Sequence, residues 1–129
     1  MALRPALLDT SVLVALESGR PVREALVPRE VFVSIVTIAE LRLGVLTAPP
    51  DQRALRLATL EGALALDPLP VDVEVAEAWT QLREQLRQLG RRMPMNDSWV
   101  AATALAHDLD VVTQDADYDD VPGLSVVRV

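Results

Sequence analysis

Short apolar runs and longer helical patterns alternate along almost the whole chain of 129 residues. Strands are predicted at residues 6–8, 31–33, 110–113 and 125–129, with a weaker one at 66–71, where two prolines interrupt the run. Helices are predicted at residues 10–18, 34–47, 52–64, 73–89 and 98–107. This order predicts an α/β fold, with a parallel sheet between two layers of helices and ligands bound at the carboxyl ends of the strands.

The composition is that of one domain, which we expect to span residues 1–129. Half of the residues are hydrophobic, enough for a sizeable core. There is no cysteine, which excludes disulfides, thiolate catalysis and cysteine-ligated metals and fits a reducing compartment. The N-terminus lacks the pattern of a signal peptide, and no apolar run reaches the roughly 20 residues of a membrane helix. We therefore expect a cytoplasmic protein without a membrane partner.

The charge of the chain excludes several enzyme classes. The formal net charge is −7, and all 12 basic residues are arginines. The absence of lysine excludes Schiff-base enzymes and P-loop NTPases. Phosphatases of the haloacid-dehalogenase type and receiver domains also need a lysine, which this chain does not have. An acidic chain is a poor candidate for holding nucleic acid by charge alone. A metal-dependent nuclease can still be acidic, because divalent cations offset its carboxylates.

Four acidic residues that lie far apart in the chain each stand beside an apolar run: Asp9, Glu40, Asp97 and Asp115. An uncompensated carboxylate is costly in such surroundings. Asp9 ends the first strand, Asp115 follows the strand at 110–113, and Asp97 begins a helix, so the predicted fold brings these positions together. Converging carboxylates suit Mg²⁺ or Mn²⁺, which prefer oxygen ligands. We interpret the four as a metal site for phosphodiester hydrolysis by a metal-activated water.

Each acidic residue also has a plainer interpretation. Asp9 and Asp97 are ordinary helix-capping residues, and Glu40 can pair with an arginine. The loop at residues 114–120 is acidic enough to be merely solvated, and it lacks the glycine and glutamate of a calcium loop. The coincidence of several acids at one predicted sheet edge favours the metal site over these alternatives.

Two further groups of polar residues flank the acids. Thr10, Ser11, Asn96 and Thr113 can orient water or phosphate, or can serve as caps and turns. Arg83, Arg87 and Arg91 recur at helical spacing before Asp97, and Arg92 follows them. We weigh this arginine stripe, and Arg87, Arg91 and Arg92 in particular, equally as an RNA contact and as a solvated face.

Four segments, taken in order, resemble the motifs of PIN-domain proteins, and most closely those of VapC-type toxins from bacterial toxin–antitoxin pairs. They are LLDTSVL at residues 7–13, IAELRLG at 38–44, PMNDSWVAATA at 94–104 and VVTQDADY at 111–118. The resemblance implies a PIN-like three-layer α/β/α sandwich with a central, mainly parallel sheet. It implies a Mg²⁺- or Mn²⁺-dependent endoribonuclease, the toxin of a type II pair, in which Asp9, Glu40, Asp97 and Asp115 surround the metal and Asp117 is an accessory ligand.

The resemblance also implies partners. Such toxins are usually homodimers, held inactive by a VapB-type antitoxin that wraps the toxin and can send a basic side chain into the acidic site, which the negative charge here favours. The helices at 52–64 and 73–89 are candidates for the antitoxin groove or the dimer contact. The pattern assigns no role to Asp119 and Asp120. The alternative function is a catalytically silent PIN-like module that only binds a partner.

Overall fold

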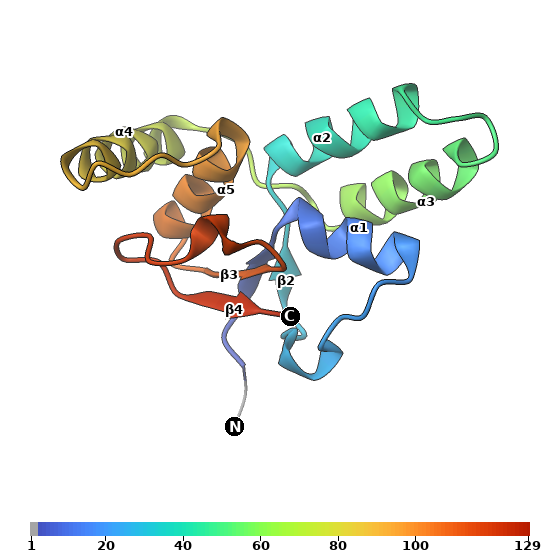
Figure 1. The fold of residues 1–129 in the computed structure, drawn as a ribbon, viewed down its shortest axis with the longest axis horizontal. Coiled ribbons are helices and arrows are strands. Elements are labelled where there is room, and N and C mark those ends of the chain that lie inside the picture. The colour runs from blue at the N-terminus through green and yellow to red at the C-terminus, as the bar shows by residue number, and fades with distance from the viewer. Residues whose placement is uncertain (1–2) are drawn as a thin grey trace.

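A parallel sheet of four strands forms the centre of the computed structural model, which describes residues 3–129. The strands are β1 (Ala6–Leu8), β2 (Val31–Phe32), β3 (Asp110–Thr113) and β4 (Val126–Arg128). Their order across the sheet is β2-β1-β3-β4, and every neighbouring pair is parallel. The predicted mainly parallel sheet is confirmed (Figure 1).

Five helices surround the sheet: α1 (Thr10–Ser18), α2 (Ile35–Leu46), α3 (Arg53–Leu64), α4 (Val73–Gln88) and α5 (Met95–Ala106). Two short 3₁₀ turns join them, η1 (Glu24–Leu26) and η2 (Ala116–Tyr118). Local sequence explains where α4 starts and stops. Asp72 caps its N-terminus by accepting a hydrogen bond from Val75 N at 3.0 Å. Gly90, just beyond its C-terminus, has a positive φ of 64°, which glycine adopts without strain.

Two predicted elements differ from the structure. The prediction of a weak strand at 66–71 is wrong. The segment makes only one isolated bridge, between Ser34 and Leu69. It does not extend into a strand because Pro68 and Pro70 have no N–H to donate to a ladder of hydrogen bonds. The helix predicted from residue 98 begins earlier, at Met95, directly after Pro94. Asn96 and Asp97 therefore lie in the first turn of α5 instead of preceding the helix.

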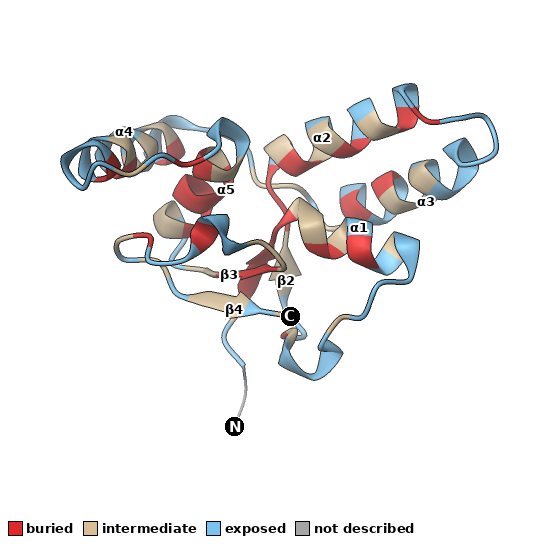
Figure 2. Cartoon of the chain, viewed as in Figure 1, coloured by how far each residue is buried: buried red, intermediate tan, exposed pale blue. Residues whose placement is uncertain are grey.

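The alternation of side chains along the strands creates two cores. Leu7 and Val111 face one side of the sheet and pack with residues of α4 and α5, including Leu82 and Val100. Ala6, Leu8 and Val112 face the other side and pack against Val12 of α1 and Val33. A third cluster holds α2 to α3, and it consists of Leu41, Val45, Leu60 and Ala63. Figure 2 shows the buried residues along these contacts, so the layers are α/β/α as expected.

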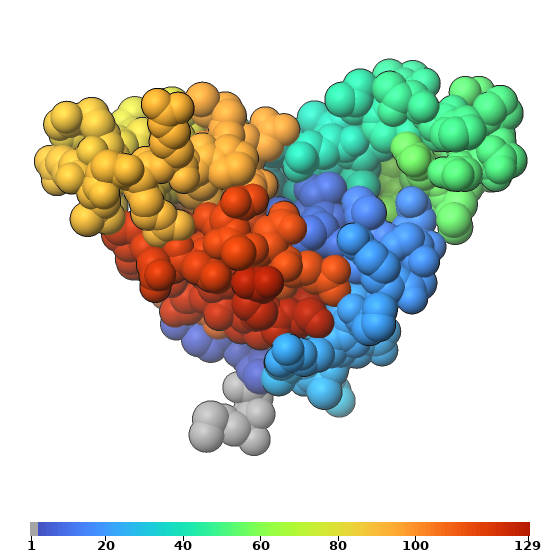
Figure 3. All heavy atoms as spheres, in the orientation of Figure 1, coloured from blue at the N-terminus to red at the C-terminus, as the bar shows by residue number. Residues whose placement is uncertain are grey.

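The helices leave a hollow above the sheet. Figure 3 shows it between the lobe formed by α4 and α5 and the lobe formed by α2 and α3. The first turns of α1, α2 and α5 meet below it, near the carboxyl ends of β1 and β3 (Figure 1). Within residues 3–129, no helix has the length and apolar character needed to cross a membrane.

Candidate active site

Asp9 lies at the bottom of the site, directly after β1, with only 1% of its surface exposed. It is the N-cap of α1, and its Oδ2 accepts a hydrogen bond from Ser11 N at 3.4 Å. The same oxygen accepts from the hydroxyls of Ser11 at 2.6 Å and Thr113 at 2.9 Å. A carboxylate can only accept hydrogen bonds, so these donors satisfy it in a place where water has little access.

Ser11 and Thr113 also connect Asp9 to the loop after β3. The Ser11 hydroxyl accepts a hydrogen bond from Gln114 N at 3.0 Å, and the Thr113 hydroxyl accepts one from Asp115 N at 2.9 Å. Each hydroxyl therefore donates to Asp9 and accepts from the backbone of the acidic loop. These two predicted accessory residues are brought to the site, and their contacts position Asp9 and Asp115 relative to each other.

Three further carboxylates gather in front of Asp9. One carboxylate oxygen each of Asp97, Asp115 and Asp117 lies within 4.8 Å of the others. Asp97 comes from the first turn of α5, and Asp115 and Asp117 come from the loop that contains η2. Asp97 and Asp115 are half-buried and Asp117 is exposed, so the group faces the solvent on one side.

The electrostatics of this group follow from its crowding. Burial, followed by the negative charges of Asp9, Asp117 and Asp115, raises the pKa of Asp97 to about 7. The pKa of Asp115 is raised for the same reasons, burial first and then the charge of Asp9. Like charges at this distance cannot all ionise without cost, unless a cation is added.

Tyr118 is a site residue that sequence reasoning missed. Its side chain is fully buried, and its hydroxyl donates to Asp9 Oδ1 at 2.8 Å and lies 3.3 Å from Asp97 Oδ1. Burial, then the neighbouring charges of Asp9 and Asp97, raises its pKa above the ordinary value for tyrosine, so it stays a donor. A buried tyrosine hydroxyl needs a partner, and a tyrosine inside an acidic loop was the available signal.

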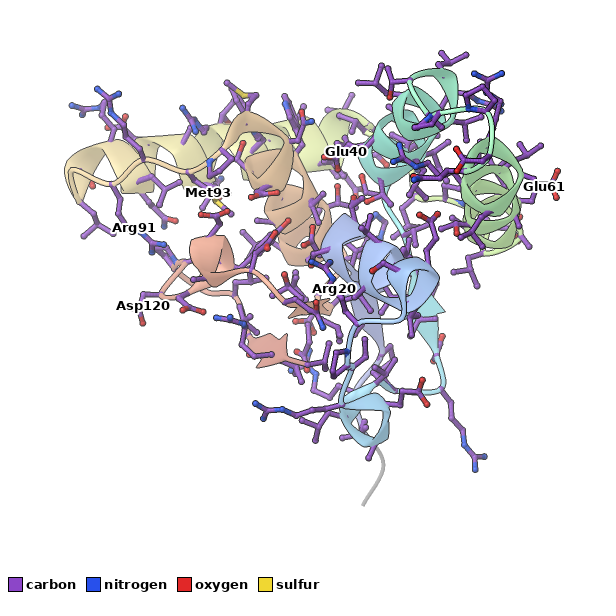
Figure 4. The ribbon with its side chains drawn as sticks, turned by 45° about the vertical axis from the view of Figure 1, so that its right-hand side comes forward. Arg20, Glu40, Glu61, Arg91, Met93 and Asp120 are labelled. Atoms are coloured by element: carbon purple, nitrogen blue, oxygen red, sulfur yellow. The ribbon has the colours of Figure 1, made fainter. Side chains whose placement is uncertain are left out.

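Glu40 stands apart from the three clustered carboxylates. It lies on the side of α2 that faces α5 (Figure 4), and its Oε1 accepts a hydrogen bond from the Thr10 hydroxyl at 2.7 Å. Thr37, on the same face, lies 3.0 Å from Thr10 Oγ1. Thr37 and Glu40 thus form a polar face of α2 toward Thr10. Among residues 3–129 no arginine forms an ion pair with Glu40, so the plainer interpretation as a salt bridge has no support.

Other predicted residues have different surroundings. Asn96 is exposed, and its side chain makes no hydrogen bond to any residue that the structure describes. Of the two aspartates to which the sequence pattern assigns no role, Asp119 forms an ion pair of 3.5 Å with Arg128. The other, Asp120, is exposed and has a positive φ of 57°. Helix α4 ends at Gln88, so Arg91 does not continue the helical arginine stripe as predicted.

The raised pKa of Asp97 predicts how the stability of the metal-free protein depends on pH. Because the folded state binds this proton more tightly than the unfolded chain, the stabilisation is fully present below about pH 4, the ordinary aspartate pKa, and is lost as pH rises through about 7. In EDTA, the thermal midpoint should therefore fall between pH 5 and pH 8, and Asp97→Asn should remove most of this fall. An equally steep fall in the variant would contradict the assignment to Asp97.

Known proteins resemble this chain over its full length. Residues 6–124 match the PIN domain family. The chain is 48% identical to Ribonuclease VapC5 of Mycobacterium tuberculosis, with 100% of this chain and 98% of that protein covered, and 45% identical to Ribonuclease VapC4 of the same organism, with both chains fully covered. A crystal structure of a member of the VapBC family of toxin–antitoxin systems, VapBC-5 from M. tuberculosis, superimposes with a TM-score of 0.89 at 44% identity, covering 98% and 99% of the two chains.

These similarities extend over the strands, the helices and all four segments that carry the acidic residues. A match of this length and identity reflects a shared family as well as a shared fold. The chain therefore belongs to the PIN-domain family and, within it, to the VapC group.

Proposed function

We propose that this chain is a Mg²⁺- or Mn²⁺-dependent endoribonuclease and the toxin of a type II toxin–antitoxin pair. The observation that carries the proposal is the cluster of Asp97, Asp115 and Asp117 in front of the buried Asp9, in a chain whose full-length relatives are named ribonucleases. The hydrolysis of RNA by such a cluster needs no nucleophilic side chain, because a metal-bound water can attack the phosphate.

The residues present fit a hard divalent cation. All of the clustered donors are carboxylate oxygens, the ligands that Mg²⁺ and Mn²⁺ prefer, and one side of the group faces the solvent, which leaves room for water ligands. The raised pKa values of Asp97 and Asp115 express a repulsion that a cation would relieve. Asp97, Asp115 and Asp117 would hold the metal, with Asp9 and Glu40 completing the acidic surroundings.

We assign different roles to the residues of the site. A bound metal would lower the pKa of a water ligand and offset the charge that develops on the phosphate. Asp9 is fixed by Ser11, Thr113 and Tyr118, so its carboxylate is oriented before substrate arrives. Glu40, whose Oε1 is held by the Thr10 hydroxyl, would accept a proton from water.

We also propose a VapB-type antitoxin as partner. Solved relatives are toxin–antitoxin structures, and the helices here expose apolar side chains that such a partner would cover. A groove of about 380 Å³ between α1 and α3 is lined by Leu13, Leu16, Leu55 and Leu66, among others. Further exposed apolar residues on α2, Leu43 and Leu46, lie next to α3 along the chain. The net charge of −7 favours a basic segment over the acidic site.

A homodimer is proposed as the state of the free toxin. The start of α4 exposes apolar side chains that a second copy would bury: Val73 is 73% exposed, and Val71, just before the helix, is 39% exposed. These residues lie on the lobe opposite the α1–α3 groove, so the antitoxin and the second copy would use different surfaces. The oligomeric state of the purified chain, measured by light scattering, tests this point.

Incubation of the purified protein with total bacterial RNA tests the proposed function. We expect discrete new RNA ends with Mg²⁺ or Mn²⁺ and none with EDTA, and sequencing of those ends identifies the target. The cognate antitoxin, added in equimolar amount, should abolish cleavage. If the folded, metal-loaded protein leaves every RNA intact, the proposal of a nuclease fails and the silent binding module is favoured.

A further inference from the structure

A pocket lined by arginines lies at the opposite end of α4 from its N-cap. It has a volume of about 290 Å³, and its lining residues are Arg83, Leu86, Arg87, Gly90, Arg91 and Arg92. Four arginine residues thus line one pocket in a protein whose net charge is −7. The turn at Gly90, with a φ of 64°, reverses the chain after α4 and brings Arg91 and Arg92 back beside Arg83 and Arg87.

Most of this positive charge is not compensated. Arg87 forms a bidentate pair with Glu84, with distances of 2.7 and 2.8 Å. Arg83, Arg91 and Arg92 have no carboxylate within 4.0 Å anywhere in residues 3–129. Within the same range, Arg91 Nη1 is the one buried side-chain polar atom that lacks a hydrogen-bond partner. Arg91 is half-buried as a whole, and an anion that contacts its guanidinium would offset the cost of the one buried nitrogen without a partner.

The pocket is connected to the acidic site by a short and well-packed path. Arg83 Nη1 donates to the carbonyl of Met93 at 3.3 Å, and its guanidinium lies 5.7 Å from the centre of the Trp79 ring. Trp79 stacks on Trp99 of α5, with ring centres 4.3 Å apart, and donates to the Ser98 hydroxyl at 3.0 Å. Ser98 is the neighbour of Asp97, so the packing of α4 against α5 fixes the arginines relative to the carboxylates.

The arginine pocket lies close enough to the acidic site for one nucleic-acid strand to contact both. Met93, whose carbonyl Arg83 contacts, and Asp97 are four positions apart in the chain, so their Cα atoms are at most about 14 Å apart. Figure 4 shows Arg91 and Met93 on the segment between α4 and α5, on the same side of the molecule as Asp120 in the loop after η2. A single nucleic-acid strand with its scissile phosphate at the carboxylates can place a neighbouring phosphate at the arginines.

We propose that the arginine pocket, chiefly Arg83, Arg91 and Arg92, binds a backbone phosphate of single-stranded RNA on one side of the cleavage point. The proposal rests on the proposed nuclease function. Guanidinium groups suit phosphate geometry, and contacts to phosphate position a strand without reading its sequence. Arg87 contributes less, because its partner Glu84 already occupies its donors. The pocket would supply the positive charge that an acidic site needs to hold a polyanion.

Binding of a short, fluorescein-labelled, unstructured RNA in EDTA tests the pocket. Arg83→Gln and Arg91→Gln should each weaken binding about 3- to 10-fold at low salt and reduce the slope of log K against log salt by about 0.7, the value for one phosphate contact on a single strand. Arg29→Gln is the matched control, because Arg29 is exposed before β2, at the amino end of the strands. Arg92→Gln serves as a further variant if Arg91→Gln fails to fold.

Unchanged RNA affinity and an unchanged salt slope in folded Arg83→Gln and Arg91→Gln would overturn the proposal. Competition by polyglutamate at the same concentration as competitor RNA would also overturn it, because the pocket would then bind an acidic protein segment. The KM of metal-dependent cleavage separates the two proposals. Cleavage with a KM indifferent to these arginines refutes the pocket alone. Arginine-dependent RNA binding without any cleavage by the wild type refutes the nuclease and leaves the pocket standing.

Discussion

Asp97→Asn is expected to lower metal-dependent RNA cleavage by more than about 100-fold, because loss even of a residue that merely supports a metal ligand costs about 10- to 100-fold. Asp97 is the carboxylate on which the others converge: it shares the cluster with Asp115 and Asp117, and the charge of Asp9 contributes to its raised pKa. The amide keeps the shape of the side chain and removes its negative charge. Cleavage rates and Mn²⁺ binding by calorimetry should fall together.

Asp119→Asn is the matched control for this variant. Asp119 belongs to the same acidic loop, but it pairs with Arg128 outside the cluster, so its loss should change the cleavage rate by less than about threefold, in line with the small worth of exposed ion pairs. A folded Asp97→Asn protein that cleaves RNA at the wild-type rate would show that the site assignment is wrong. Equal losses in both variants would indicate that overall loop charge, and not the cluster, supports activity.

Tyr118→Ala is expected to destabilise the protein by about 3–5 kcal/mol, the range for truncation of a large buried aromatic side chain. Tyr118 is among the largest fully buried side chains and belongs to the cluster that packs Leu7 and Val111 against α5. Its removal leaves a cavity under η2 and removes a donor from Asp9. Urea unfolding, followed by circular dichroism, measures the loss in the free energy of unfolding.

Tyr118→Phe separates the ring from the hydroxyl. Phenylalanine fills the same volume, so the loss of stability should be only about 0.5–1.5 kcal/mol, the net worth of one hydrogen bond. Asp9 Oδ1 would lose its donor, and cleavage should fall roughly tenfold, as expected for a residue that orients a metal-site carboxylate. If Phe destabilises as much as Ala, the hydroxyl and not the packing of the ring holds η2 in place.

The sequence predicted the part of the site that follows from topology. Parallel strands place their carboxyl ends at one edge, so Asp9 after β1 and Asp115 after β3 had to lie close together once the alternation of strands and helices was recognised. Helical periodicity likewise placed Glu40 and Thr37 on one face of α2. These inferences use only spacing along regular elements, which a sequence displays directly.

What the sequence did not predict depends on irregular segments. The burial of Tyr118 requires the acidic loop to fold back as η2, and no periodic pattern indicates such a turn. The arginine pocket depends on the reversal at Gly90, because α4 ends at Gln88 and this turn, not a continued helix, brings Arg91 beside Arg83 and Arg87. The early start of α5 at Met95 moved Asn96 and Asp97 into its first turn, where only one of them joins the site.

The hydrogen bonds from Thr113 to Asp9 and from Gln114 N to Ser11 join two segments that lie more than 100 residues apart in the chain. During synthesis Asp9 leaves the ribosome long before residues 113–118 exist, and β4, which pairs with β3, is made later still. On the proposed function, the nascent chain therefore has no assembled centre and cannot cut the message that encodes it. Catalytic competence would begin only after residues 113–118 have left the ribosome, and until then an antitoxin already present can capture the folding chain.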